Sequence, residues 1–176
     1  MIASGVHDIE EVLEKVEWGT LMFFASLFIL MEGLGELGLI SFIGDNTAKL
    51  IEGAPEGKAR LAAAIVLIVW VSGIVSAFID NIPFTTAMVP IIYNLHTTLN
   101  LPLTPLVWAL SFGTCFGGNG TLIGASANVV CAGLSEQAGF PISFNRFFKM
   151  GFPVMLLSLL IATSYLLVFH VAISWY

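Results

Sequence analysis

The chain has 176 residues, of which 57% are hydrophobic and only 10% are charged, with a formal net charge of −6. An ordinary soluble domain is about 25% charged, so this composition argues against a soluble protein and favours an all-α membrane protein. The acidic balance also excludes most nucleic-acid-binding proteins, because a phosphate backbone requires a basic surface.

Residues 1–17 predict an amphipathic helix that lies on a surface and precedes a membrane domain of residues 18–176. Within residues 8–17 the apolar side chains recur at helical spacing, and acidic residues are opposite or beside them, as the sequence DIEEVLEKVE shows. The segment is acidic rather than basic, so it does not resemble a cleavable signal peptide.

Three apolar runs predict helices that enter the membrane. Residues 19–33 follow an interfacial Trp18, and residues 60–79 form the clearest run, with a single charge at Arg60. Residues 152–175 form the last span, after a separate short helix capped by Ser143. Between the first two runs, residues 34–52 are interrupted by glycines and predict only weak amphipathic structure.

Polar residues interrupt the central apolar sequence at two places. The first interruption is Asp80-Asn81-Ile82-Pro83, and the second is the glycine-rich sequence GGNGT at residues 117–121. The apolar arm 84–95 that follows the first is too short to cross a hydrocarbon core of about 30 Å. We therefore predict a re-entrant hairpin with its tip at Asp80, followed by a discontinuous, unwound transmembrane helix at the glycines. Secondary transporters place their ion and substrate sites at such breaks.

A purely structural interpretation is open for each of these residues. Asp80 would lie in an aqueous turn if both arms crossed the membrane completely. Pro83 fits the first turn of a helix, and the hydroxyl of Thr85 fits a bond to its own helix. The glycines fit close packing between helices equally well.

The motifs DNIPFT (residues 80–85) and GGNGTLIGASAN (residues 117–128) together resemble the C-terminal half of melanosomal P protein-like members of the ion transporter superfamily. Citrate and dicarboxylate carriers, arsenite pumps and sodium/proton antiporters belong to the same superfamily. The resemblance implies two inverted repeats with the substrate between them. Only the C-terminal repeat is recognisable in this chain. The lipid bilayer, the N-terminal repeat from the same parent chain or a partner, and a second copy in a homodimer are therefore the expected partners.

The resemblance matches Asn81 to the hairpin tip of sodium-coupled carriers, and Gly120, Thr121 and Gly124 to their unwound loop. The two interruptions and the motifs supply the other site residues, and no residue is expected to be catalytic. We predict binding of substrate and ion by Asp80, Asn81, Pro83, Thr85, Gly118, Asn119, Gly120, Thr121, Gly124 and Asn128. Asn81, Asn119 and Thr121 form a predicted sodium site, and the coupling ion, sodium or a proton, is the only cofactor expected. Asp80 stands where carboxylate carriers have serine, and its charge would repel a dicarboxylate and favour a cation or proton.

These features predict half of a secondary active transporter that moves a small anion or exchanges sodium for protons. Two alternatives stay open, an anion channel-like conductance that regulates organelle pH and a non-transporting membrane scaffold. An enzyme is not expected, because the three histidines are scattered and Asp80 has no second membrane acid beside it. The resemblance implies an acidic organelle, such as a melanosome-like or lysosome-related compartment, for this multi-pass protein. The basic residues do not decide its orientation.

Overall fold

The structure is a computed structural model that describes residues 16 and 18–175, and the regular secondary structure of these residues is entirely helical. The prediction of an all-α protein is therefore confirmed for the described part of the chain. The predicted amphipathic helix at residues 1–17 lies outside the described residues except for Val16.

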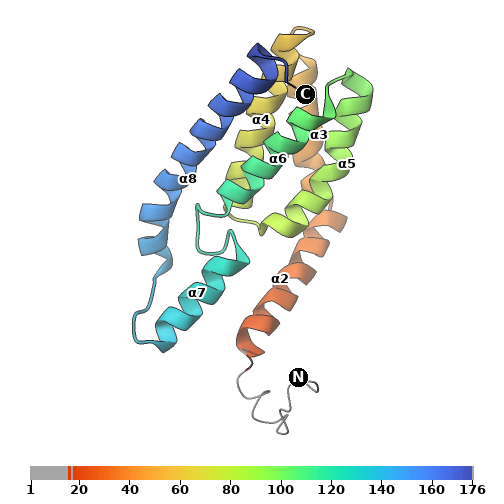
Figure 1. The fold of residues 1–176 in the computed structure, drawn as a ribbon. Helices are drawn as coiled ribbons and strands as arrows, with labels where there is room; N and C mark the ends of the chain where they lie inside the picture. The colour runs from red at the N-terminus through yellow and green to blue at the C-terminus, as the bar shows by residue number, and fades with distance from the viewer. Residues whose placement is uncertain (1–15, 17, 176) are drawn as a thin grey trace, which may run out of the picture.

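Most helices run roughly along the long axis of the molecule (Figure 1). In chain order they are α2 (Trp18–Glu36), α3 (Leu39–Glu52), α4 (Lys58–Ser76), α5 (Asn81–Leu99), α6 (Leu103–Gly117), α7 (Ser126–Gln137), α8 (Phe144–Leu166) and the π-helical η2 (Leu167–Ala172). Helix α4 begins at the end of the molecule where η2 lies, α5 ends there, and the two helices meet near the middle of the molecule (Figure 1).

Helices α4 and α6 form the centre of the fold because small residues let their backbones approach closely. A methyl group added at Gly117 would overlap the backbone of Gly73 on α4, and one added at Gly113 would lie 2.8 Å from the carbonyl oxygen of Val69. The hydroxyl of Ser76 crosses this contact and donates to the carbonyl of Thr114 at 2.9 Å. Such small-residue contacts are the usual way in which helices associate inside a membrane.

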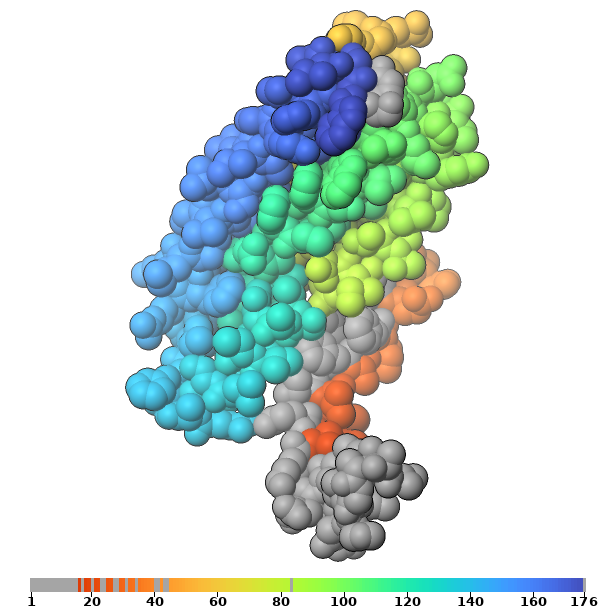
Figure 2. Space-filling view, in the orientation of Figure 1, coloured from red at the N-terminus to blue at the C-terminus, as the bar shows by residue number. Residues whose placement is uncertain are grey.

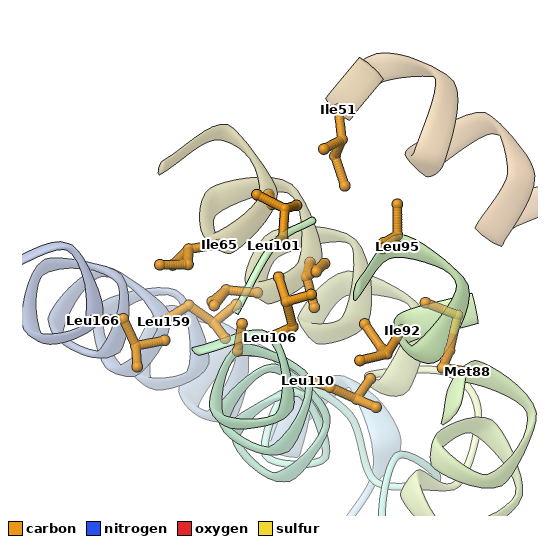
Figure 3. Packing of buried hydrophobic residues seen from close by; sticks show 14 of the residues in the cluster. Ile51, Ile65, Met88, Ile92, Leu95, Leu101, Leu106, Leu110, Leu159 and Leu166 are labelled. Carbon is orange, nitrogen blue, oxygen red and sulfur yellow. The ribbon is translucent and has the colours of Figure 1, made fainter. Parts of the chain in front are cut away.

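The hydrophobic core surrounds this central pair. Figure 3 shows side chains from α3, α4, α5, α6 and α8 converging, among them Ile65, Ile92, Leu106 and Leu159. By contrast, Leu157, Leu160 and Ile161 are exposed on the outer face of α8. By length and composition, two helical runs among the described residues could cross a membrane, Lys58–Ser76 and the continuous Phe144–Ala172.

The second helix of the predicted hairpin is longer than the sequence suggested. The sequence predicted an apolar arm of only residues 84–95, but α5 extends over 19 residues, from Asn81 to Leu99. The hydroxyls of Thr97 and Thr98 donate to carbonyls within the same helix, and the backbone ends the helix at Asn100 with φ 55°. Polar threonines thus remain helical because the helix satisfies their hydroxyls.

The two helices expected around Ser143 and residues 152–175 are a single helix. Ser143 caps α8 as predicted, accepting from the backbone N–H of Arg146 at 3.4 Å, but the helix then continues past Pro153 to Leu166. The separate last span was therefore a wrong prediction. Membrane helices accommodate an internal proline, because neighbouring groups satisfy the carbonyl that loses its partner.

The contact between α4 and α6 gives a direct test. We expect Gly117→Ala to destabilise the protein by about 1–3 kcal/mol, because the added methyl group has no space against Gly73. Gly133→Ala on α7 is the matched control, since nothing lies within 4 Å of an added methyl group there. Thermal unfolding in detergent measures both variants, and equal melting temperatures would contradict the close packing.

Candidate functional site

The turn between α4 and α5, residues 77–80, ends in a buried carboxylate. Asp80 is only 1% exposed, and its Oδ1 accepts from the backbone N–H of Ile82 at 3.1 Å, so it caps α5. Its second oxygen, Oδ2, is buried and has no hydrogen-bond partner among the described residues. Protein covers Asp80, so the structure does not support the alternative of an aqueous turn. A buried oxygen without a partner is costly, and a proton or a cation would relieve that cost.

The interruption between α6 and α7, residues 118–125, is here called the glycine loop, and side-chain hydrogen bonds hold it in place. The buried hydroxyl of Thr121 donates to the carbonyl of Ala77 at the end of α4. From the first turn of α7, the side-chain amide of Asn128 donates to the carbonyls of Gly118 at 2.8 Å and Thr121 at 3.1 Å. The loop is therefore tied both to itself and to the turn that carries Asp80.

The glycines of this loop are needed for close packing against the same turn. An added methyl group would lie 2.7 Å from the carbonyl oxygen of Ala77 if placed on Gly124, and 2.9 Å from the Cβ of Ala77 if placed on Gly120. On Gly118 it would lie 3.0 Å from the carbonyl oxygen of Gly124. Close packing, the structural interpretation left open by the sequence, therefore applies to them. That packing also brings the loop against the Asp80 turn.

The predicted residues of α5 lie on a neighbouring surface. Asn81 and Thr85 line a groove of about 490 Å³ between the start of α5 and the end of α6, together with Thr86 and Thr114. The hydroxyl of Thr86 bonds the carbonyl of Ile82 in its own helix at 3.0 Å. The backbone of Pro83 lies in the first turn of α5, where the missing N–H has no consequence for the helix.

The structure does not bring the three predicted sodium ligands into one cavity. Asn81 lines the groove beside α6, whereas Asn119 is exposed and lines a different cavity, between α7 and α8. The hydroxyl of Thr121 already donates its hydrogen bond to the carbonyl of Ala77. The predicted residues that do meet are Gly120, Thr121 and Gly124, which pack against Ala77 in the turn that ends at Asp80, with Asn128 bonded to the same loop.

Sequence reasoning missed the buried polar residues of the surrounding helices. Ser72 and Ser76 on α4 are fully buried, and Ser72 Oγ has no hydrogen-bond partner among the described residues. Thr114 on α6 is also buried, and its carbonyl accepts from the hydroxyl of Ser76. The available signal was the recurrence of small residues four apart on α4, at Ser72 and Ser76 and at Gly73 and Ala77.

Comparisons with known proteins place these features in a wider context. Residues 1–113 match the family model described as citrate transporter. The P proteins of Sus scrofa and Homo sapiens are each 55% identical over 99% of this chain. The alignment covers 21% of each of those proteins, so the chain spans about a fifth of their length.

Bacterial relatives are more distant and cover a larger share of their own length. A protein of Mycobacterium tuberculosis named as an uncharacterised transporter is 40% identical over 94% of this chain and 38% of its own length. A second uncharacterised transporter, from Synechocystis, is 34% identical over 92% of this chain and 38% of its own length. No solved structure matches the chain.

The hydrogen bond from Thr121 to Ala77 predicts how firmly the glycine loop is held. Replacing Thr121 with Val removes the donor and leaves a buried carbonyl unpaired, which costs about 1–3 kcal/mol of local stability. We expect roughly tenfold faster amide hydrogen exchange across residues 118–125 of the full-length protein. Thr86→Val is the control, because that hydroxyl bonds only its own helix. Equal exchange in the two variants would show that the bond does not hold the loop.

Proposed function

Because this chain belongs to the citrate transporter family of integral membrane proteins, we propose that it forms one half of an ion-coupled secondary active transporter. The observation that carries the proposal is the buried, unpaired Oδ2 of Asp80 beside two breaks in helical structure. Discontinuous helices that meet at a polar site are the arrangement that secondary transporters use for substrate and coupling ion.

In this proposal α4 and α5 form a re-entrant hairpin. The amine of Lys58 at the start of α4 lies 3.4 Å from the carbonyl oxygen of Ala172 at the end of η2. At the other end of α4, a methyl group added at Gly120 would touch both Ala77 and Met155, so the turn is level with Met155 on α8. If Phe144–Ala172 crosses the membrane, the hairpin extends about 25 Å into the membrane from the side of Ala172, at 1.5 Å per helical residue. Its turn then lies roughly 16 Å short of Phe144 on the other side.

The position of the turn along α8, and not the length of the second helix, is what supports a re-entrant hairpin. Helices α4 and α5 each have 19 residues, so neither is too short to cross a bilayer. Their depth relative to α8 supports re-entry instead. The glycine loop lies at the same depth as the turn, which supports an unwound segment of a membrane helix formed by α6 and α7.

We propose that Asp80 holds the coupling ion, a proton or a sodium ion. Its Oδ1 is used to cap α5, and its Oδ2 is free to take a proton or to contact a cation. The carboxylate already occupies the positive N-terminal end of α5, where the carboxylate of a substrate would otherwise bind. Sodium/proton exchange, or proton-coupled movement of a small anion, therefore fits this end of the site better than uptake of a dicarboxylate.

The groove lined by Asn81, Thr85 and Thr86 supplies the surface for the transported molecule in this proposal. Its second wall would come from the inverted repeat in the rest of the full-length protein, since the chain spans only 21% of the P proteins it matches. The homodimer and the acidic organelle remain predictions from the resemblance.

Asp80 provides the decisive test of this function. The full-length protein is reconstituted in liposomes that contain a pH-sensitive dye, and sodium gradients or gradients of small anions are applied. We expect Asp80→Asn to reduce ion-driven proton movement roughly tenfold or more, because the variant has lost the charge that binds the ion. Asp45→Asn is the matched control, since Asp45 is an exposed acid on α3, away from the turn.

Two outcomes would contradict the proposal in different ways. Equal proton movement in wild-type protein and Asp80→Asn would show that Asp80 does not bind the ion, without contradicting the proposal that the protein is a transporter. Single-channel currents in a planar bilayer, with turnover far above that of a carrier, would favour the channel alternative.

A further inference from the structure

A second cavity, separate from the Asp80 turn, lies between α7 and α8. Its volume is about 680 Å³, within the range of roughly 300–1,000 Å³ typical of ligand sites. Apolar side chains form most of its wall, namely Phe140, Ile142, Phe147, Met150 and Val154. Arg146 is the charged residue among those that line it, and no acidic side chain of the described residues does so.

The guanidinium of Arg146 has no partner in the described part of the chain. The ion pair found among the described residues joins Arg60 and Glu56, and the hydrogen bond between Arg146 and Ser143 involves the backbone N–H of Arg146 and not its guanidinium. Lys149 follows one turn later and is also exposed. The cavity therefore combines an unpaired fixed cation with an apolar interior, which is the chemistry that recognises an anion carrying a hydrocarbon body.

The position of Arg146 indicates which amphiphilic anion would bind. Arg146 lies in the first turn of α8, at the start of the run Phe144–Ala172 that is long and apolar enough to cross the membrane. That is the depth at which arginine side chains meet lipid headgroups. Figure 2 shows α7 and the first half of α8 side by side at the end of the molecule away from η2. The apolar part of the cavity continues from Arg146 along α8 to Val154, deeper in that run.

We propose that this cavity binds one anionic phospholipid, with its phosphate on Arg146 and an acyl chain against Phe147, Met150 and Val154. A small water-soluble anion would use Arg146 alone and would leave the apolar wall without a function. The site also reaches the glycine loop, because Asn119 lines the cavity and its carbonyl packs against Gly151 of α8. The inference is independent of the transport function proposed for Asp80.

Lipid retention by the full-length protein tests the site. The protein is reconstituted in nanodiscs of phosphatidylcholine with a minor fraction of phosphatidylglycerol, extracted, and analysed by native mass spectrometry for bound lipid. We expect selective retention of phosphatidylglycerol by the wild type and a roughly tenfold weaker preference in Arg146→Gln, since charge-assisted hydrogen bonds are lost. Val154→Trp, which fills the apolar end without changing charge, is expected to reduce retention of the same lipid.

Controls separate this site from general attraction between charges. Lys49→Gln removes an exposed positive charge from α3, outside the cavity, and should leave retention unchanged. Equal losses in Lys49→Gln and Arg146→Gln would overturn the proposal in favour of nonspecific electrostatics. Displacement of the lipid by glycerol phosphate, which carries the headgroup phosphate without acyl chains, would show a free-anion site and also overturn it. Unchanged retention in Val154→Trp would exclude the acyl chain from the cavity.

Discussion

The contact between the end of α4 and the glycine loop is the constraint on which the rest of this structure depends. Two interruptions of helical structure leave backbone carbonyls without helical partners, and in a bilayer no water is present to satisfy them. Here the hydroxyl of Thr121 donates to the carbonyl of Ala77, and the side-chain amide of Asn128 donates to two carbonyls of the loop. Each break is thereby stabilised by the other, which is possible only because glycines allow the two segments to touch.

This arrangement separates polar groups that support the structure from those that remain available. Ser76, Thr121 and Asn128 all donate to backbone carbonyls, and their hydrogen bonds account for the shape of the loop and its attachment. Asp80 differs from them because one of its oxygens caps α5 while the other is buried without a partner. Among the described residues, the buried side-chain atoms without a partner are Ser72 Oγ and Asp80 Oδ2. Only the carboxylate oxygen can carry a negative charge, and for this reason we propose it as the place for a proton or a cation.

The sequence predicted where the helices are interrupted more accurately than where they end. Charged residues, proline and clustered glycines stand out in an apolar chain, so the breaks near Asp80 and Gly118 were visible without a structure. The end of α5 was not, because Thr97 and Thr98 satisfy their hydroxyls within the helix although their polarity suggests a loop. The partner of Thr121 was also beyond sequence reasoning, since a backbone carbonyl such as that of Ala77 has no residue signature.

If Asp80 holds a proton or a cation as proposed, its geometry allows the charge of the site to change without loss of the helix cap. The carboxylate caps α5 through Oδ1, and a proton added to Oδ2 would leave Oδ1 able to accept from the N–H of Ile82. A cation bound at Oδ2 would leave the same hydrogen bond intact. Helix α5 would therefore keep its cap in the empty, protonated and cation-bound states of the proposed site. Because Oδ2 alone differs between these states, a partner repeat could distinguish them through contacts at that atom.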